Sequence, residues 1–335
     1  MYSLEEIISP INDELKRVEK EFSRLLQTSF QLITGITGHL NLQPGKRLRP
    51  ILVLLGGYIC GRITPKTYKA AALLEMLHNA TLIHDDVVDD APLRRGNPTF
   101  NTLLKNKISV LIGDYILARL LLAMVELNNL RAIKLLAETS VRMTRGEIAQ
   151  LISPAYAGNN IITETEYIHI ISDKTASLIS ASCQLGALMA SASDEQIAAL
   201  KNYGEKIGQA FQIRDDILDI EGTEEVLGKQ KGADIKNGKL TLPLLYALNT
   251  APSSQKNKMV RIISRRKRSL REKKNGPTDI EEVLHFINKS GGTAYARQYA
   301  LRLSEEAKEE LAVFPDSVYK MVLVQLSDYI VHREK

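Results

Sequence analysis

The sequence predicts an all-α protein, a bundle of roughly ten or more helices around one core. Apolar residues recur at three- and four-residue spacing along most of the chain, and strand-like alternation is nearly absent. Short stretches rich in Gly, Pro and Asn separate the helical segments. These separators are QPGK at 43–46, APLRRGNP at 91–98, SPAYAGNN at 153–160 and LGKQKGADIKNGK at 227–239.

The helical segments follow in chain order. Ser9 and Pro10 suit the N-cap and first position of a helix whose apolar residues continue to Leu26. The same spacing predicts further helices at 73–81, 116–124 and 207–218. Small residues crowd ISASCQLGALMASAS at 179–193, which favours close helix packing. Helical spacing returns from 280 to 335.

Composition predicts one domain over 1–335. Hydrophobic residues at 44% and charged residues at 25% are typical of a globular protein, and no composition break precedes residue 250. From 251 to 280 the chain becomes polar and basic, which is typical of a mobile insertion. Its run SRRKRSLREKK at 264–274 has no aromatic interleaving or known nucleic-acid motif, so no nucleic-acid partner is expected.

Cysteine usage and hydropathy indicate the compartment. Cys60 and Cys183 are the only cysteines, too few for a disulfide framework, so we expect a reducing, cytoplasmic location. The first residues lack the apolar region of a secretory signal. The stretches 51–61 and 115–125 are shorter than the ~18 residues that span a bilayer, so no transmembrane segment is expected. Peripheral membrane contact stays open.

One acidic pattern, DDxxD, occurs twice, each time at the end of an apolar helical run. On a helix its first and last carboxylates lie one turn apart on one face, where like charges repel. Pro92 ends the first helix near its acids, at the negative end of the helix dipole, so a cation is expected. A single copy would more often be a solvated helix end, but two favour a metal site. The copies are Asp85, Asp86 and Asp89, then Asp215, Asp216 and Asp219.

Basic residues accompany both acidic motifs. Mg²⁺ usually takes one or two carboxylates together with water and substrate phosphate, and arginine can bind phosphate with two donors. Acidic pairs beside basic turns therefore predict a site for a polyanion bridged by a metal, although a basic turn alone would more often be incidental. The bases are Lys46, Arg47 and Arg49 upstream, Arg94 and Arg95 after the first motif, and Lys229 and Lys239 after the second.

These motifs together resemble the trans-isoprenyl diphosphate synthases, or polyprenyl synthetases. GKRLRP, LIHDDVVDDAPLRRGNPT, DKTASL, FQIRDDILD and LGKQKGADIKNGKLTLP occur in the family's order over nearly the whole chain. The resemblance implies an all-α fold with a deep central cavity, the two acidic motifs facing each other across its mouth, and a homodimer. It also implies Mg²⁺-assisted loss of pyrophosphate from an allylic diphosphate, followed by attack of isopentenyl diphosphate on the carbocation.

The resemblance also assigns roles to single residues. It makes Asp85, Asp89 and Asp215 the Mg²⁺ ligands, with Asp86, Asp216 and Asp219 in support. Arg94, Lys174, Thr175, Gln212, Lys229 and Lys239 would surround the allylic diphosphate, with Lys174 and Lys229 taking part in catalysis. Gly45, Lys46, Arg49, His78 and Arg95 would hold isopentenyl diphosphate. Without the resemblance, His78 would be a buried, hydrogen-bonded histidine, and Arg214 has no assigned role.

Product length depends, in this family, on the cavity wall beneath the first acidic motif. Bulky aromatic residues four or five positions upstream mark short-chain enzymes, and here these positions are Thr81 and Ala80. Leu77, Leu74 and Met124 could form the floor. We therefore expect a product of roughly six to nine isoprene units, made from a farnesyl or geranylgeranyl starter. The prenyl side chain of a quinone is the expected use of such a product.

Several alternatives remain. The chain could make a shorter farnesyl or geranylgeranyl product, or require a small accessory subunit. A terpene cyclase would have no use for GKRLRP or Arg95, and aromatic residues at 5% with no Trp weakly oppose a cavity built for cation–π contacts. A non-catalytic subunit could lose its acids, whereas both motifs are intact here.

Overall fold

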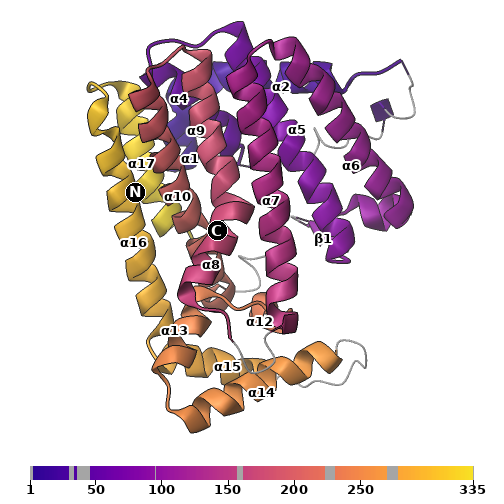
Figure 1. Cartoon of the computed structure of the whole chain (residues 1–335), viewed down its shortest axis with the longest axis vertical. Helices are drawn as coiled ribbons and strands as arrows, with labels where there is room; N and C mark the ends of the chain where they lie inside the picture. Colours follow the sequence, from indigo (N-terminus) through magenta and orange to yellow (C-terminus); the bar gives the residue numbers. More distant parts are fainter. Residues whose placement is uncertain are drawn as a thin grey trace. The chain divides into compact units, whose positions relative to one another are not determined.

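A computed structural model describes residues 3–29, 34–35, 46–94, 96–156, 161–222, 231–269 and 278–334, with the backbone alone for 154–156, 264–269 and 278. In these residues the secondary structure is helical except for one hairpin of two short strands (Figure 1). The predicted all-α fold class is confirmed. The chain divides into two compact units, and the prediction of one domain over 1–335 stays a prediction.

The first unit comprises Met1–Ser140, Leu178–Gly204 and Glu310–Leu326. Its elements are α1 (Leu4–Ile8), η1 (Ser9–Ile11), α2 (Asn12–Leu26), α4 (Leu48–Ile59), α5 (Pro65–Val88), β1 (Leu93–Arg94), β2 (Asn97–Pro98), α6 (Phe100–Leu127), most of α9 (Ser177–Met189), η3 (Leu311–Val313), and the earlier parts of α7 (Leu130–Tyr156), α10 (Asp194–Glu221) and α17 (Val318–His332).

The second unit comprises Val141–Ser177, Glu205–Glu309 and Ser327–Lys335. It contains α8 (Glu164–Ile171), the π-helical turn η2 (Ser172–Ala176), α12 (Ala233–Lys236), α13 (Leu242–Thr250), α14 (Ser253–Ser269), α15 (Thr278–Lys289), nearly all of α16 (Gly292–Glu310), and the later parts of α7, α10 and α17.

Helix α5 is the central helix of the first unit. It begins with Pro65 at its first position, after Thr64, whose side chain takes part in a capping box with Thr67. It packs against α2, α4 and α6. Its small and aliphatic residues are buried on several sides, as expected of a core helix.

Close packing of α9 against α4 depends on glycine. A Cβ added at Gly186 would lie 2.1 Å from the carbonyl oxygen of Val53, and one at Gly56 would lie 2.5 Å from that of Cys183. These separations leave no room for a side chain at either glycine. The close packing expected for 179–193 is therefore confirmed.

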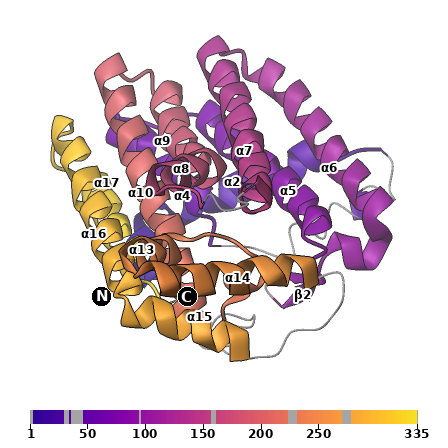
Figure 2. The same ribbon diagram turned by 60° about the horizontal axis from the view of Figure 1, so that its bottom comes forward.

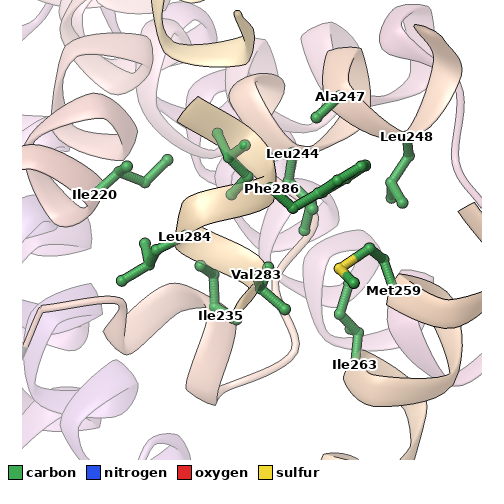
Figure 3. Close-up of a cluster of buried hydrophobic side chains, with 11 residues drawn as sticks. Ile220, Ile235, Leu244, Ala247, Leu248, Met259, Ile263, Val283, Leu284 and Phe286 are labelled. Carbon is green, nitrogen blue, oxygen red and sulfur yellow. The ribbon is translucent and has the colours of Figure 1, made fainter. Parts of the chain in front are cut away.

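The core of the second unit joins α12, α13, α14 and α15, of which Figure 2 labels α13, α14 and α15. Figure 3 shows its side chains: Ile220, Ile235, Leu244, Ala247, Leu248, Val283, Leu284 and Phe286 pack with Met259 and Ile263 of α14. Part of the basic segment 251–280 is thus a helix whose apolar face is buried. Its mobility stays a prediction, and 270–277 lie outside the described residues.

Helix α6 is the one helix, among the residues that the structure describes, long and apolar enough to cross a membrane. Of its most apolar stretch, 39% is buried inside the structure, and a core helix of a globular protein passes the same test. The prediction that no segment spans a membrane therefore stays a prediction. Cys60 and Cys183 are free thiols.

Candidate active site

The first acidic motif lies at the end of α5, where the backbone turns. Asp89 is the C-cap residue, and Asp90 adopts the left-handed conformation with φ 48°. The N–H of Ala91 donates to the carbonyl of Asp86 at 3.0 Å, and that of Asp90 to Val87 at 3.4 Å. This is the Schellman pattern, with aspartate in the position that usually favours glycine. The helix therefore ends at Val88, inside the acidic motif and earlier than the end beside Pro92 that the sequence predicted, because the backbone turns at Asp90.

Asp85 and Asp89 keep the predicted helical relation. The N–H of Asp89 donates to the carbonyl of Asp85 at 2.8 Å, so their side chains start one turn apart on one side of the helix. Asp85 is half-buried and Asp89 is exposed. Both are thus accessible to a ligand.

Asp86 is buried against an arginine. Its residue is 5% exposed, and its Oδ1 accepts from Nε of Arg94 at 2.8 Å and lies 2.7 Å from Nη2. Arg94 lies on β1 of the hairpin that follows α5, and the hydroxyl of Thr99, after β2, donates to the carbonyl of Ala91, before β1, at 2.7 Å. Arg94, predicted to bind the allylic diphosphate, therefore neutralises a buried acid in this structure. Arg95 lies outside the described residues.

The predicted isopentenyl diphosphate residues lie in the first unit. Lys46 is exposed just before α4, and Arg49 is half-buried in the first turn of α4. His78 is half-buried on α5. Arg47 forms an ion pair with Glu19 of α2. Gly45 lies outside the described residues, and a shared diphosphate site for this group stays a prediction.

The residues predicted to limit product length belong to the core of the first unit. Leu74 and Ala80 on α5 are fully buried, Leu77 is 1% exposed, and Met124 on α6 is 4% exposed. Thr81 is half-buried, and its hydroxyl donates to the carbonyl of His78 at 2.9 Å. A cavity wall made by these residues stays a prediction.

The second acidic motif lies on α10, and its carboxylates are held differently from those of the first. The side chain of Asp215 is 42% exposed, whereas Asp216 and Asp219 are buried. Asp216 accepts hydrogen bonds from the hydroxyl of Tyr167 at 2.7 Å and from Nε2 of Gln212 at 2.9 Å. Asp219 accepts one from the backbone N–H of Asp234 at 3.0 Å.

Burial disfavours the charged form of the Asp216 carboxyl group. The pKa of Asp216 is raised to about 7, chiefly by burial and also by the nearby charges of Asp234 and Asp215, against the lowering effect of the hydrogen bonds from Tyr167 and Gln212. Burial and the charge of Asp216 also raise the pKa of Tyr167 well above its usual value. Asp216 is thus a buried acid near two further acids, and a cation beside it would lower the cost of its charge.

A continuous chain of hydrogen bonds links η2 to the acidic motif. The hydroxyl of Thr175 donates to Oε1 of Gln212 at 2.8 Å, and Gln212 in turn donates to Asp216. Three residues assigned from the sequence to one site are thus brought together. The neighbouring Lys174 forms an ion pair with Glu147 of α7, with Nζ 2.5 Å from Oε2.

The π-helical turn that carries Lys174 and Thr175 packs closely against α7. The N–H of Ser177 bonds five residues back to the carbonyl of Ser172, which widens the helix by one residue. A Cβ added at Gly146 of α7 would lie 2.4 Å from the backbone nitrogen of Lys174. Glycine at 146 therefore permits this packing.

Other contacts were missing from the sequence interpretation. Lys239 lies with Nζ 3.3 Å from Oδ1 of Asp234, a residue of the basic turn that received no role. Tyr167 precedes Lys174 by about two helical turns, a signal that could have indicated it. Glu147 lies far away in the sequence and gave no such signal. Lys229 lies outside the described residues.

The available donors fit a Mg²⁺ ion that is bound partly through a diphosphate. Within the described ranges, no group of three or more His, Cys, Asp and Glu side chains is gathered closely enough to hold a metal. Mg²⁺ needs only one or two carboxylates when substrate phosphate and water complete its shell. Asp85 with Asp89, and separately the half-exposed Asp215, offer oxygen donors of this kind.

Comparison with known proteins decides the family, since residues 30–279 match the family described as Polyprenyl synthetase. The chain belongs to this family. It is 33% identical over 324 residues to an all-trans-nonaprenyl-diphosphate synthase (geranyl-diphosphate specific) of Rhodobacter capsulatus, covering 96% of each chain. It is 43% identical over 246 residues to heptaprenyl diphosphate synthase component 2 of Geobacillus stearothermophilus, covering 73% of this polyprenyl synthetase and 76% of that relative.

A solved structure extends the likeness to the fold. The polyprenyl synthase of Caulobacter crescentus, complexed with calcium and isoprenyl diphosphate, superimposes with a TM-score of 0.90 at 32% identity and covers 99% of this chain and 98% of its own. The predicted family, fold class and enzyme class, a prenyltransferase, are confirmed. The roles of individual residues in this polyprenyl synthetase stay predictions.

Proposed function

We propose that this chain is a long-chain trans-polyprenyl diphosphate synthase, which condenses isopentenyl diphosphate onto farnesyl or geranylgeranyl diphosphate. The pair of intact acidic motifs, each accompanied by basic residues, is the observation that carries the proposal. Similarity to synthases named for nonaprenyl and heptaprenyl products supports the long chain. The small residues Ala80 and Thr81 support it as well, because neither is bulky enough to stop a growing chain.

The Mg²⁺ ligands in this proposal are Asp85, Asp89 and Asp215, with Asp86, Asp216 and Asp219 in support. When bound, Mg²⁺ would stabilise the negative charge that develops on the departing diphosphate. The two buried acids of the second motif are positioned by Tyr167, Gln212 and the backbone of Asp234. These hydrogen bonds keep the motif in one arrangement before substrate binds.

The cations proposed to surround the allylic diphosphate are already oriented by acids. Arg94 contacts Asp86, Lys174 contacts Glu147, and Lys239 contacts Asp234. Fixed positive charge of this kind needs little reorganisation when the leaving diphosphate gains charge, which favours ionisation. Thr175 and Gln212 add polar contacts, and Lys229 completes the proposed set.

We propose that the protein works as a homodimer through an exposed apolar face on α6. Side chains on this helix are 46–70% exposed although they are large and apolar: Leu103, Ile108, Leu111, Leu121, Leu122 and Val125. An apolar face of this extent is typical of a surface that another protein covers. A second copy of the chain would bury it symmetrically.

A purified-protein assay tests the proposed function. The chain alone is incubated with Mg²⁺, labelled isopentenyl diphosphate and farnesyl diphosphate, with a parallel sample in which a chelator removes the metal. We expect a linear polyprenyl product that depends on the metal. A cyclic hydrocarbon would instead identify a terpene cyclase, and a product limited to farnesyl or geranylgeranyl length would contradict the long-chain assignment.

A two-component synthase is the second candidate. It is favoured by the 43% identity to a relative named component 2 of a heptaprenyl diphosphate synthase. In this case the purified chain would be inactive alone and would form product only when a small accessory protein is added. The same assay, run with and without that protein, separates the two arrangements.

A further inference from the structure

The residues that follow α17 contact the second acidic motif. Nη2 of Arg333 lies 2.5 Å from Oδ1 of Asp215 and also donates to the carbonyl of Phe211 at 3.2 Å. The Cζ atom of the same guanidinium lies 3.8 Å from the centroid of the Phe211 ring, a cation–π contact. One arginine is therefore held against α10 by a carboxylate, a carbonyl and an aromatic ring.

The backbone of Arg333 is fixed as well. Arg214, which is buried directly before the motif, donates from Nε at 2.9 Å and from Nη2 at 2.7 Å to the carbonyl oxygen of Arg333. Two donors on one oxygen leave this segment little freedom to turn away from α10. Arg214 thus contacts a backbone carbonyl rather than an aspartate, which gives a role to a residue that the sequence left unassigned.

The pair of Arg333 and Asp215 is strongly asymmetric in exposure. The side chain of Arg333 is 6% exposed, whereas that of Asp215 is 42% exposed. The arginine therefore approaches the carboxylate from its buried side, and the carboxylate stays accessible from solvent. A counter-ion that leaves when a metal arrives would be exposed and loosely held, and Arg333 is neither.

We propose that Arg333, held in place by Arg214, is a positioning residue that orients the Asp215 carboxylate for the Mg²⁺–diphosphate complex. This inference rests on the proposed function, in which Asp215 is a metal ligand. Partners that fix the orientation of a ligating carboxylate typically change metal affinity or activity by about 10- to 100-fold when they are removed. A charged donor with two contacts besides the carboxylate suits this task.

Calorimetry of pyrophosphate binding in the presence of Mg²⁺ tests the proposal without turnover. We expect Arg333→Met to weaken this binding by about 10- to 100-fold, and Arg333→Lys, which keeps the charge but has fewer donors, to recover part of it. Arg302→Met is the matched control, because Arg302 also contacts a carboxylate, that of Glu306 with Nε 3.6 Å from Oε1, and an aromatic ring, that of Tyr299 with Cζ 4.5 Å from its centroid. It should bind as the wild type does.

A double-mutant cycle shows whether Arg333 acts through Asp215. Asp215→Asn alone should weaken binding, and adding Arg333→Met should cause little further loss. Losses that simply add, or an Arg333→Met variant that binds as tightly as the wild type, would overturn the inference. Should Arg333→Met fail to fold by circular dichroism, Arg333→Lys and Arg333→Gln decide, because only a positioning role predicts that lysine binds more tightly than glutamine.

The wild-type measurement separates this inference from the function on which it rests. A wild-type protein that binds no pyrophosphate with Mg²⁺ would remove both. Metal-dependent binding by the wild type together with unchanged binding by the Arg333 variants would remove only the role of Arg333.

Discussion

The three carboxylates of the second acidic motif lie in three different environments. Asp215 is half-exposed beside Arg333, Asp216 is buried between neutral donors, and Asp219 is buried at the backbone N–H of Asp234. Accessibility alone makes Asp215 the best candidate to touch a metal. The division of the motif into one ligand and two supporting acids, taken from the resemblance, stays a prediction.

Substitution of Tyr167 tests how much its hydrogen bond to Asp216 stabilises the protein. Its buried hydroxyl donates to Asp216, so Tyr167→Phe removes a donor from a buried carboxylate and should lower the free energy of unfolding by about 1–3 kcal/mol. Urea denaturation measures the change. Tyr295→Phe is the control, since Tyr295 donates to Glu164 in a partly exposed place and should cost less. Equal losses in the two variants would contradict the expectation that the donor to Asp216 stabilises the protein more than the donor to Glu164.

Ala80 tests the proposed control of product length. Ala80→Tyr places a large side chain one turn and a residue before Asp85, where it should stop chain growth early and shorten the product. Because Ala80 is fully buried, overpacking should also cost about 1–3 kcal/mol. Chromatography of the dephosphorylated products measures chain length, and circular dichroism confirms folding. A folded variant with an unchanged product would remove Ala80 from the explanation.

At the scale of residues, Thr175, Gln212 and Asp216, to which the resemblance gave roles at one site, are joined by hydrogen bonds, while the roles themselves stay predictions. The partners of the cations were not predictable, because Glu147 and Asp234 are ordinary acids until folding places them beside Lys174 and Lys239. Charge pairing across helices depends on packing, which periodicity alone does not specify.

Among the elements, the π-helical turn η2 depends on close packing against α7. Gly146→Ala should destabilise the protein, because an added Cβ at 2.4 Å from a backbone nitrogen cannot be relieved by a side-chain movement. The cost of overpacking, about 1–3 kcal/mol, should exceed the gain of about 1 kcal/mol in helix propensity. Urea denaturation measures the balance. Gly35→Ala, with no atom within 4 Å of the added carbon, is the control, and a stabilised Gly146→Ala would contradict this packing.

Substitutions on the exposed face of helix α6 test the proposed homodimer. Leu111→Glu and Val125→Glu place charge on side chains that are 65% and 70% exposed in a single chain, so they should fold normally and dissociate the proposed dimer. Size-exclusion chromatography with light scattering measures the mass. Met321→Glu, at a 53% exposed site on α17, should leave the dimer intact. A dimer that survives both α6 substitutions would contradict the proposed interface.

Helical segments were predictable because apolar periodicity reports them directly. The turn at 91–98 was recognised from its Gly and Pro residues, yet its pairing of Leu93 with Pro98 was not. The segment DKTASL was compatible with an ordinary helix start. Its π-helical form depends on contact with Gly146 of another helix, which no local pattern reveals.

For the whole molecule, the order of the motifs along the chain was the strongest indication of the family. Single motifs were weak signals, but five motifs in the family's order indicated the polyprenyl synthetases, and the match over 30–279 agrees. The division into two units was not expected, because composition changes little before residue 250. Three long helices, α7, α10 and α17, have residues in both units, so the boundary leaves no mark in the sequence.

In the proposed function, both acidic motifs are needed to hold Mg²⁺ and a diphosphate. Equilibrium dialysis of labelled pyrophosphate at fixed Mg²⁺ tests it most directly, with Asp85→Asn, Asp215→Asn and the control Asp194→Asn, whose carboxylate pairs with Arg131. We expect either motif substitution to weaken metal-dependent binding strongly and the control to match the wild type. Wild-type affinity in Asp85→Asn or in Asp215→Asn would contradict the account.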